Sequence, residues 1–412
     1  MSATIQKSSE YSIPYPLSDI INAVAVNPKT SNVYVAQCYY PNKILEMHDD
    51  GNKTSPLSLK SSIELGAYCP FALAVDYTNN RLYVSTEYES IKTPSNQRPV
   101  DTKIIDLATG NITHTFPGLK IGAIDQYHSR VYLIADEYYQ IPSHSSTITV
   151  LDGRTSNQIS QINYGEGGFK DPIDLESDPN SGLLYLLVHS DKEPSDGTGR
   201  GPISLISISA INGSLVNSVV LDSTANGLAL NPDTRTIFVS DFLYNATKDV
   251  NDLRQVGAIL VMDASKLIIQ SKIPVNNLPN HIAIDLNSNR VLVIDYSRDV
   301  SAFTLTVVDG QRLAVEGRVI IQKLAHDYKG LAANPTTGTA FAVTYASEPP
   351  VSQPGQVIAI HPDMDSFSET NNARMLDSVY IFNFPLNFAI IVAVVVLGIL
   401  VVVKYFIKRT SK

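Results

Sequence analysis

Four oxygen-bearing side chains stand at the ends of predicted β-strands and could together hold a metal ion. Asn226 and Asn280 lie where strands begin, and Asp241 and Asp295 lie where the following strands end. If the fold gathers these strand ends around one axis, their amide and carboxylate oxygens suit calcium or another divalent cation. The same residue types are also common turn formers that accept backbone N–H groups, and this second interpretation stays open.

Tyrosine is concentrated in segments that are predicted to be loops, which is typical of a recognition surface. Its side chain offers a large amphipathic contact area with few rotatable bonds, as in antibody loops. The alternative is that these tyrosines only pad the bases of the loops. The eight loop tyrosines are Tyr39, Tyr40, Tyr88, Tyr138, Tyr139, Tyr244, Tyr296 and Tyr345.

Seven related stretches cover nearly all of the chain before residue 362, so the sequence is a repeat. Each contains an alternating apolar strand, a turn with Asn or Asp, and a second strand with a large apolar centre, as in INAVAVNPKTSNVYVAQ from Ile21. Alternation with a period of two between turns predicts β-hairpins. The centres recur every 49 to 54 residues, at Tyr34, Tyr83, Tyr132, Tyr185, Phe238, Leu292 and Phe341.

A second hairpin follows the first in each repeat and completes a four-stranded unit. Examples are KIIDLATGNITHTF from Lys103 and TVVDGQRLAVEGRVI from Thr306. Four strands in about 50 residues are the size of a β-propeller blade. The sequence therefore predicts an all-β fold, a seven-bladed β-propeller over residues 21–362, preceded by an N-terminal segment, 1–20, that holds a closing strand.

The tracts AVNPKTSNVYVAQ and ALNPDTRTIFVSD resemble the YVTN-type propeller repeat of archaeal surface-layer proteins, a relative of the NHL repeat. The resemblance extends over about residues 20–361. It implies a surface or binding role, which is the usual one in that family. Related propellers of lactonase type hydrolyse substrates at an axial metal site, which implies an alternative role as a metal-dependent hydrolase or lyase at the channel mouth.

The seventh repeat shows only three strand signals, the last of them at residues 356–362. The segment EYSIPYP, residues 10–16, can supply the fourth, because an outermost strand tolerates proline at its unpaired edge. Alternating strand directions then place every connection between second and third strands on one face of the ring, here called the loop face. The chain leaves the ring at the opposite face, here called the turn face.

Cys38 and Cys69 fall at the loop face of adjacent blades, which makes a disulfide between them geometrically feasible. Closing a loop of about 30 residues would stabilise the fold by roughly 3–4 kcal/mol. The alternative is a pair of buried thiols. Glycosylation sequons occur at about the frequency expected by chance, at Asn52, Asn111, Asn212 and Asn245.

Residues 386–403 contain no charged side chain and form a run long enough to span a membrane. At 1.5 Å per residue the run makes about 27 Å of helix, against a hydrocarbon core of about 30 Å. Aromatic residues flank it on both sides, as in an interfacial belt. The sequence predicts a polar linker at 363–380, a transmembrane helix at 381–407 and a basic tail at 408–412.

The observations that bear on the side of the membrane on which the propeller lies point in opposite directions. The basic tail favours a cytoplasmic C-terminus by the positive-inside rule, and a disulfide favours an oxidising compartment. The first ten residues contain no apolar secretory segment, which suits a tail-anchored protein with a cytosolic propeller. We expect a single-pass protein of the cell membrane with an extracellular propeller and a cytoplasmic C-terminus.

Composition and motifs favour a binding or structural protein over a catalyst. Of the 412 residues only 17% are charged, and the net charge of -9 disfavours nucleic acid as a partner. G-x-S-x-G, H-E-x-x-H and P-loop motifs do not occur. We therefore expect a membrane-anchored propeller that binds a protein, glycan or envelope component through its loop face. It would need no cofactor, apart from the divalent cation of the alternative.

Overall fold

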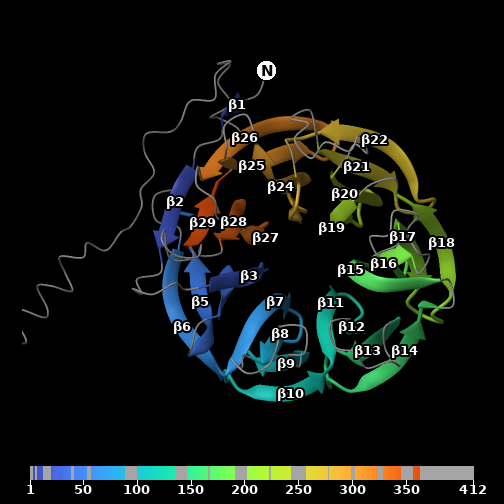
Figure 1. Cartoon of the computed structure of the whole chain (residues 1–412). Coiled ribbons are helices and arrows are strands. Elements are labelled where there is room, and N and C mark those ends of the chain that lie inside the picture. The colour runs from blue at the N-terminus through green and yellow to red at the C-terminus, as the bar shows by residue number, and fades with distance from the viewer. Residues whose placement is uncertain are drawn as a thin grey trace, which may run out of the picture.

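Each repeat folds into one antiparallel sheet, and the seven sheets stand as blades around a central axis (Figure 1). The predicted all-β, seven-bladed propeller is thereby confirmed. This computed structural model describes residues 3–4, 7–12, 20–38, 41–52, 57–88, 100–135, 146–165, 168–190, 202–221, 224–242, 257–276, 278–297, 302–322, 328–344 and 356–361.

The first four blades run from the innermost to the outermost strand in chain order. Blade 1 consists of β3 (Ile20–Asn27), β4 (Asn32–Cys38), β5 (Asn42–Asp49) and β6 (Leu57–Gly66). Blade 2 consists of β7 (Tyr68–Asp76), β8 (Arg81–Tyr88), β9 (Val100–Asp106) and β10 (Ile112–Pro117). Blade 3 consists of β11 (Leu119–Asp125), β12 (Arg130–Ala135), β13 (Thr147–Asp152) and β14 (Gln158–Asn163). Blade 4 consists of β15 (Phe169–Asp178), β16 (Leu183–Ser190), β17 (Ile203–Ser209) and β18 (Leu215–Val220).

The last three blades follow the same plan, and the N-terminal strands join two of them. Blade 5 consists of β19 (Thr224–Asn231), β20 (Thr236–Phe242), β21 (Ala258–Asp263) and β22 (Ile268–Pro274). Blade 6 consists of β23 (Ile282–Asp285), β24 (Arg290–Ser297), β25 (Ala302–Asp309) and β26 (Ala314–Gln322), with β1 (Ala3–Thr4) at its edge. Blade 7 consists of β27 (Tyr328–Asn334), β28 (Thr339–Thr344), β29 (Gln356–Ile360) and β2 (Lys7–Ser12).

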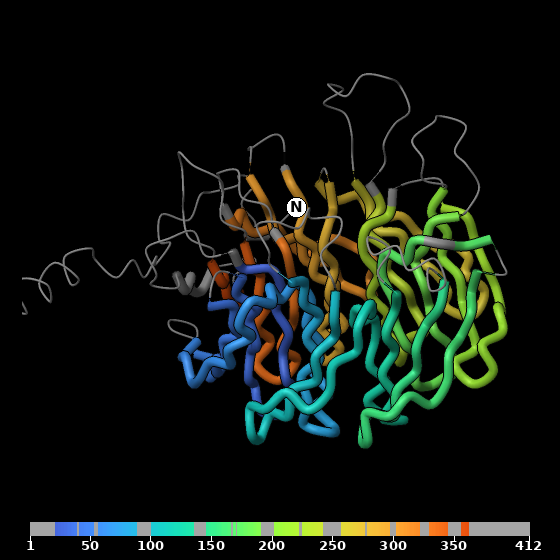
Figure 2. Tube along the Cα trace, turned by 60° about the horizontal axis from the view of Figure 1, so that its bottom comes forward, coloured from blue at the N-terminus to red at the C-terminus, as the bar shows by residue number. Residues whose placement is uncertain are grey.

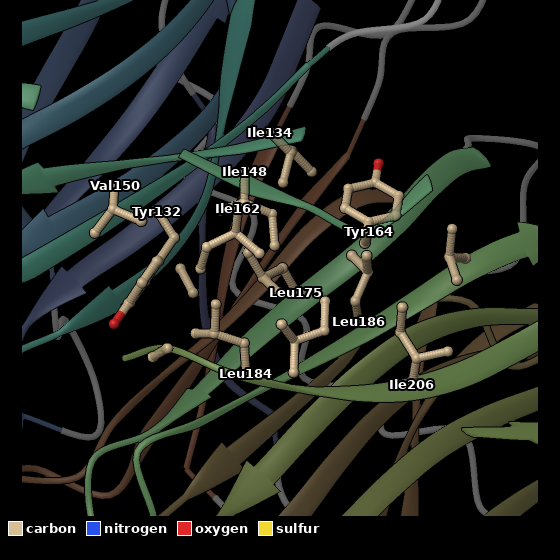
Figure 3. Close-up of a cluster of buried hydrophobic side chains, with 14 residues drawn as sticks. Tyr132, Ile134, Ile148, Val150, Ile162, Tyr164, Leu175, Leu184, Leu186 and Ile206 are labelled. Atoms are coloured by element: carbon tan, nitrogen blue, oxygen red, sulfur yellow. The ribbon is translucent and has the colours of Figure 1, made fainter. Parts of the chain in front are cut away.

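The core lies between blades, and the predicted strand centres form its middle layer. Tyr34, Tyr83, Tyr132, Tyr185, Phe238 and Phe341 are among the largest fully buried side chains. Figure 3 shows one such layer, in which Tyr132 of blade 3 packs with Leu175 and Leu184 of blade 4. Burying side chains of this size contributes about 1.5–3 kcal/mol each, so contact between neighbouring blades holds the ring together.

An Asn or Asp at the end of each innermost strand folds the first hairpin of each blade. In blade 3, Asp125 Oδ1 accepts the N–H groups of Tyr127 (3.0 Å) and His128 (2.9 Å). Asn27, Asp76, Asp178, Asn231, Asp285 and Asn334 accept backbone N–H groups in the same way. Four of these seven residues are aspartates, so part of the acidity of the chain is used to form turns.

The N-terminal strand closes the ring, three residues earlier in the sequence than predicted. Strand β2 starts at Lys7, pairs antiparallel with β29 and is described as far as Ser12, whereas the prediction placed the strand at 10–16. The stretch 7–12 contains no proline and can donate its N–H groups, in contrast to the proline-containing residues 13–16. Strand β1 adds an unpredicted parallel pairing with β26.

The chain leaves the ring at the turn face, as predicted. Ile360 at the end of β29 pairs with Ala340, beside the turn at 335–338. His361, the last described residue, contacts the hydroxyl of Thr339 through Nδ1 (3.2 Å). The predicted linker, membrane helix and tail lie outside the described residues, and no helix within the described part of the chain is long and apolar enough to span a membrane.

Candidate functional site

The two faces of the ring differ in the length of their connections. On the turn face, the turns between first and second strands take four residues each, for example 28–31 and 77–80, and the turns between third and fourth strands take four to seven (lower side of Figure 2). The connections between second and third strands all start and end on the loop face. They span residues 39–41, 89–99, 136–146, 191–202, 243–257, 298–301 and 345–355. Long loops on a rigid scaffold are where binding residues concentrate, so the loop face is the candidate site.

Two of the predicted loop tyrosines lie among the described residues, and both pack at the base of a loop. Tyr88 ends β8 and meets Tyr68 edge to face, with ring centroids 5.5 Å apart. Tyr296, near the end of β24, meets Phe303 in the same geometry at 5.2 Å. Tyr88 keeps 38% of its surface exposed, so it packs at the base of the loop and still reaches the surface. Outside the described residues lie Tyr39, Tyr40, Tyr138, Tyr139, Tyr244 and Tyr345.

Blades 1 and 2 are fastened to each other on the loop face. A disulfide joins Cys38 at the end of β4 to Cys69 at the start of β7. The Asn22 amide donates to the Pro70 carbonyl (3.2 Å) across the same joint. Next to it, Lys103 Nζ lies 3.7 Å from the centroid of the Tyr68 ring, and burial lowers the pKa of Lys103. This joint gives the loop face a rigid edge.

The four residues predicted to bind a metal come from two neighbouring blades. Asn226 is exposed at a bulge of β19, and Asp241 is buried in β20 of the same blade. Asn280 precedes β23 in blade 6, where its carbonyl accepts the Ser240 hydroxyl (3.3 Å). Across the described part of the chain, no three His, Cys, Asp or Glu side chains cluster as metal ligands.

The carboxylate of Asp295 in blade 6 accepts hydrogen bonds from its own blade and from Asn276, which lies between blades 5 and 6. One oxygen accepts the Asn276 backbone N–H (3.1 Å) and the Thr306 hydroxyl (2.8 Å), and the other accepts the Asn276 side-chain amide (3.1 Å) and the Thr304 hydroxyl. Burial raises the pKa of Asp295, and these four donors oppose the rise. The geometry of Asp295 matches the turn-and-acceptor interpretation, since its oxygens already have donors.

A pair of carboxylates on the innermost strand of blade 4, Asp174 and Glu176, was not predicted from the sequence. Asp174 Oδ2 accepts the N–H of Leu228 in blade 5 (2.9 Å), so Asp174 points toward that blade. Glu176, two residues further along β15, points to the same side because side chains alternate along a strand. The residue of blade 7 that corresponds to Asp174 is Gly330. A Cβ added to Gly330 would stand 3.2 Å from the backbone nitrogen of Val24 in blade 1, so blade 7 has little room for a side chain at the position where blade 4 has a carboxylate.

The surroundings of this pair favour its neutral forms. Desolvation, and then the charge of Asp174, raise the pKa of Glu176 to about 8. Desolvation raises the pKa of Asp174 to about 6, although the N–H groups of Leu228 and Leu175 and the charge of Lys120 oppose the rise. A carboxyl group with a pKa near neutrality can give or take a proton at physiological pH.

An alignment of the seven repeats on their turn residues could have revealed Glu176. The position two residues before the Asn or Asp that ends the innermost strand pairs with the large centre of the second strand, as Glu176 pairs with Tyr185. In the other six blades this position is Ala25, Ala74, Ala123, Ala229, Ala283 and Ala332. A single glutamate among six alanines is a substitution that the packing of the blades does not require.

Three of the four predicted glycosylation sites lie exposed on the turn face. Asn52 follows β5, Asn111 precedes β10, and Asn212 lies between β17 and β18. The Asn212 side chain accepts the backbone N–H of Ser214 (3.1 Å). Asn245 lies outside the described residues.

Comparisons with known proteins support the fold and do not extend to the site. No family model matches the chain, and no curated protein matches it. A solved structure of hydrazine synthase from Kuenenia stuttgartiensis is similar to it, with a TM-score of 0.60. The similarity covers 84% of this chain and 97% of that chain at 14% sequence identity. At this identity the likeness shows the propeller fold alone.

Proposed function

We propose that this chain is a membrane-anchored, extracellular binding protein whose loop face holds a protein, glycan or envelope component. The observation that carries the proposal is the asymmetry of the ring: five of the seven loop-face connections take 11 to 15 residues, whereas the turns on the other face take four to seven. The disulfide and the aromatic contacts of Tyr88 and Tyr296 fix the bases of three loops. Fixed loop bases reduce the entropy that is lost on binding.

The path of the chain supports an anchor below the turn face. The ring ends at the turn face, and the apolar run 386–403 follows it in the sequence. An anchor attached there turns the loop face away from the membrane. The resemblance to archaeal YVTN-type surface proteins remains a prediction that agrees with this role.

Loop-face variants test the proposal directly. The full-length protein in detergent would be applied to a glycan array and incubated with purified envelope proteins. We expect Tyr88→Ala and replacement of 243–257 by a short Gly-Ser linker to weaken the strongest signal at least tenfold. Tyr127→Ala, which removes an exposed tyrosine from the turn face, is the matched control. Equal signals from all variants would contradict a loop-face site.

The alternative is a metal-dependent hydrolase or lyase at the channel mouth, and the Asp174–Glu176 pair is the observation that keeps it open. Its ligands would be Asn226, Asp241 and Asn280, with Asp295 only if it released its present donors. Metal analysis of the purified protein tests this role. Bound metal that Asp241→Ala removes, together with a hydrolytic activity, would favour it over the binding role.

A further inference from the structure

Exposed apolar side chains gather on the turn face. Ile211, in the turn between β17 and β18, is 83% exposed, and Tyr127, in the turn between β11 and β12, is 82% exposed. Leu286 is exposed in the corresponding turn of blade 6. Three outermost strands, β10, β18 and β22, begin at this face with an exposed apolar residue: Ile112, Leu215 and Ile268.

This arrangement is not a uniform property of the ring surface. At loop-face strand ends, the large exposed apolar side chains among the described residues are Tyr88 and Val220. A face on which large apolar side chains concentrate is a candidate for contact with a partner or a membrane. The turn face is therefore the side on which a contact is expected.

The connection to the rest of the chain identifies what covers this face. The ring ends at His361 on the turn face, and the apolar run 386–403 follows. Residues 363–380, fully extended, reach about 60 Å, so the linker lets the turn face meet the bilayer. Tyr, Ile and Leu are residues that insert at the boundary between headgroups and acyl chains.

The charged groups of the turn face are arranged to suit lipid headgroups. Arg154, Lys266 and Arg312 are exposed in the turns between third and fourth strands. The Asp preceding each of them accepts its backbone N–H at 2.8, 2.9 and 2.8 Å, which ties the carboxylate to the turn. Arg312 Nε lies 3.4 Å from Oδ2 of its own Asp309, so Arg154 and Lys266 are the exposed cations offered to phosphate groups.

We propose that the turn face rests on the phospholipid bilayer, with Ile211, Leu215 and Ile268 of blades 4 and 5 inserted at its interface. This inference rests on the membrane anchor of the proposed function and adds a second, peripheral contact to it. The loop face, on the opposite side of the ring, is then directed away from the lipid.

Two positions on strand β18 provide a matched test. Leu215 starts the strand at the turn face, and Val220 ends it at the loop face, about 17 Å away. Full-length Leu215→Cys and Val220→Cys variants would each carry an environment-sensitive fluorophore, since the native cysteines are already paired. In phosphatidylcholine vesicles containing doxyl-labelled lipid, we expect at least threefold stronger quenching at 215 than at 220, with a blue-shifted emission.

The remaining outcomes distinguish the lipid contact of the turn face from the membrane anchor on which it rests. Equal quenching at both positions in protein that resists alkaline extraction would overturn the lipid contact and leave the anchor intact. Protein that is released by alkaline extraction would overturn both proposals. A blue shift without lipid quenching that grows with protein density would mean that a second copy covers the face, which also contradicts the proposal.

The sequon at Asn212 provides a second check, because a glycan there would hold the neighbouring Ile211 away from the bilayer. We expect mass spectrometry of the protein from its native membrane to find Asn212 unmodified. Full occupancy of Asn212 by a glycan would contradict the lipid contact.

Discussion

Glu176 is the residue whose environment departs most clearly from the repeat. Six blades place alanine opposite the large centre of the second strand, and blade 4 places a carboxyl group opposite Tyr185. Its raised pKa means that the folded chain keeps a proton which the unfolded chain releases between about pH 4.5 and 8. The free energy of unfolding should therefore fall as the pH rises through this interval.

Restoring the alanine of the other blades tests this reasoning. We expect Glu176→Ala to raise the free energy of unfolding at pH 8 by roughly 2 kcal/mol, after allowance for partial solvent access, and to flatten its dependence on pH. Denaturant titrations between pH 5 and 8 would measure both effects. Glu64→Ala, on the exposed edge of blade 1, is the control. A variant as pH-dependent as the wild type would refute the assignment.

At the scale of elements, β2 completes blade 7 by pairing with β29. Its removal would expose the edge of β29, whose side chains are buried. We expect deletion of residues 1–17 to lower the free energy of unfolding by roughly 3 kcal/mol or more, because ladder hydrogen bonds and apolar contacts are lost together. Thermal unfolding followed by circular dichroism would measure the loss.

Deletion of residues 1–6 is the matched control, because it removes β1 and keeps β2. We expect a much smaller change from it, since β1 contributes two residues to blade 6. An unchanged melting temperature after deletion of 1–17 would show that β2 does not close the ring.

The disulfide is a second element-scale device, because it joins blade 1 to blade 2 across 31 residues. We expect the double variant Cys38→Ser/Cys69→Ser to have a free energy of unfolding about 3–4 kcal/mol below that of the wild type. Reductant should lower the free energy of unfolding of the wild type by the same amount and leave that of the variant unchanged. Mass spectrometry that finds two free thiols in the native protein would contradict the assignment.

At the scale of the whole molecule, the sequence predicted the ring because its pattern repeats seven times. Alternating strands, Asx turns and strand centres such as Tyr34 and Phe341 are local features, and each was found as predicted. The closing strand was displaced because pairing depends on β29, which is distant in sequence. The oxygen ligands were harder to predict, since strand-end position alone does not show that Asp295 already has four donors, two from blade 6 and two from Asn276 in the connection before it.

If an anchored ring presents its loop face outside the cell, its loops are open to a protease that is added to intact cells. We expect this protease to cleave loop-face connections such as 89–99 and 243–257 without lysis, while an epitope tag after residue 412 stays protected. A propeller that resists the protease until the membrane is broken would lie inside the cell, against this expectation.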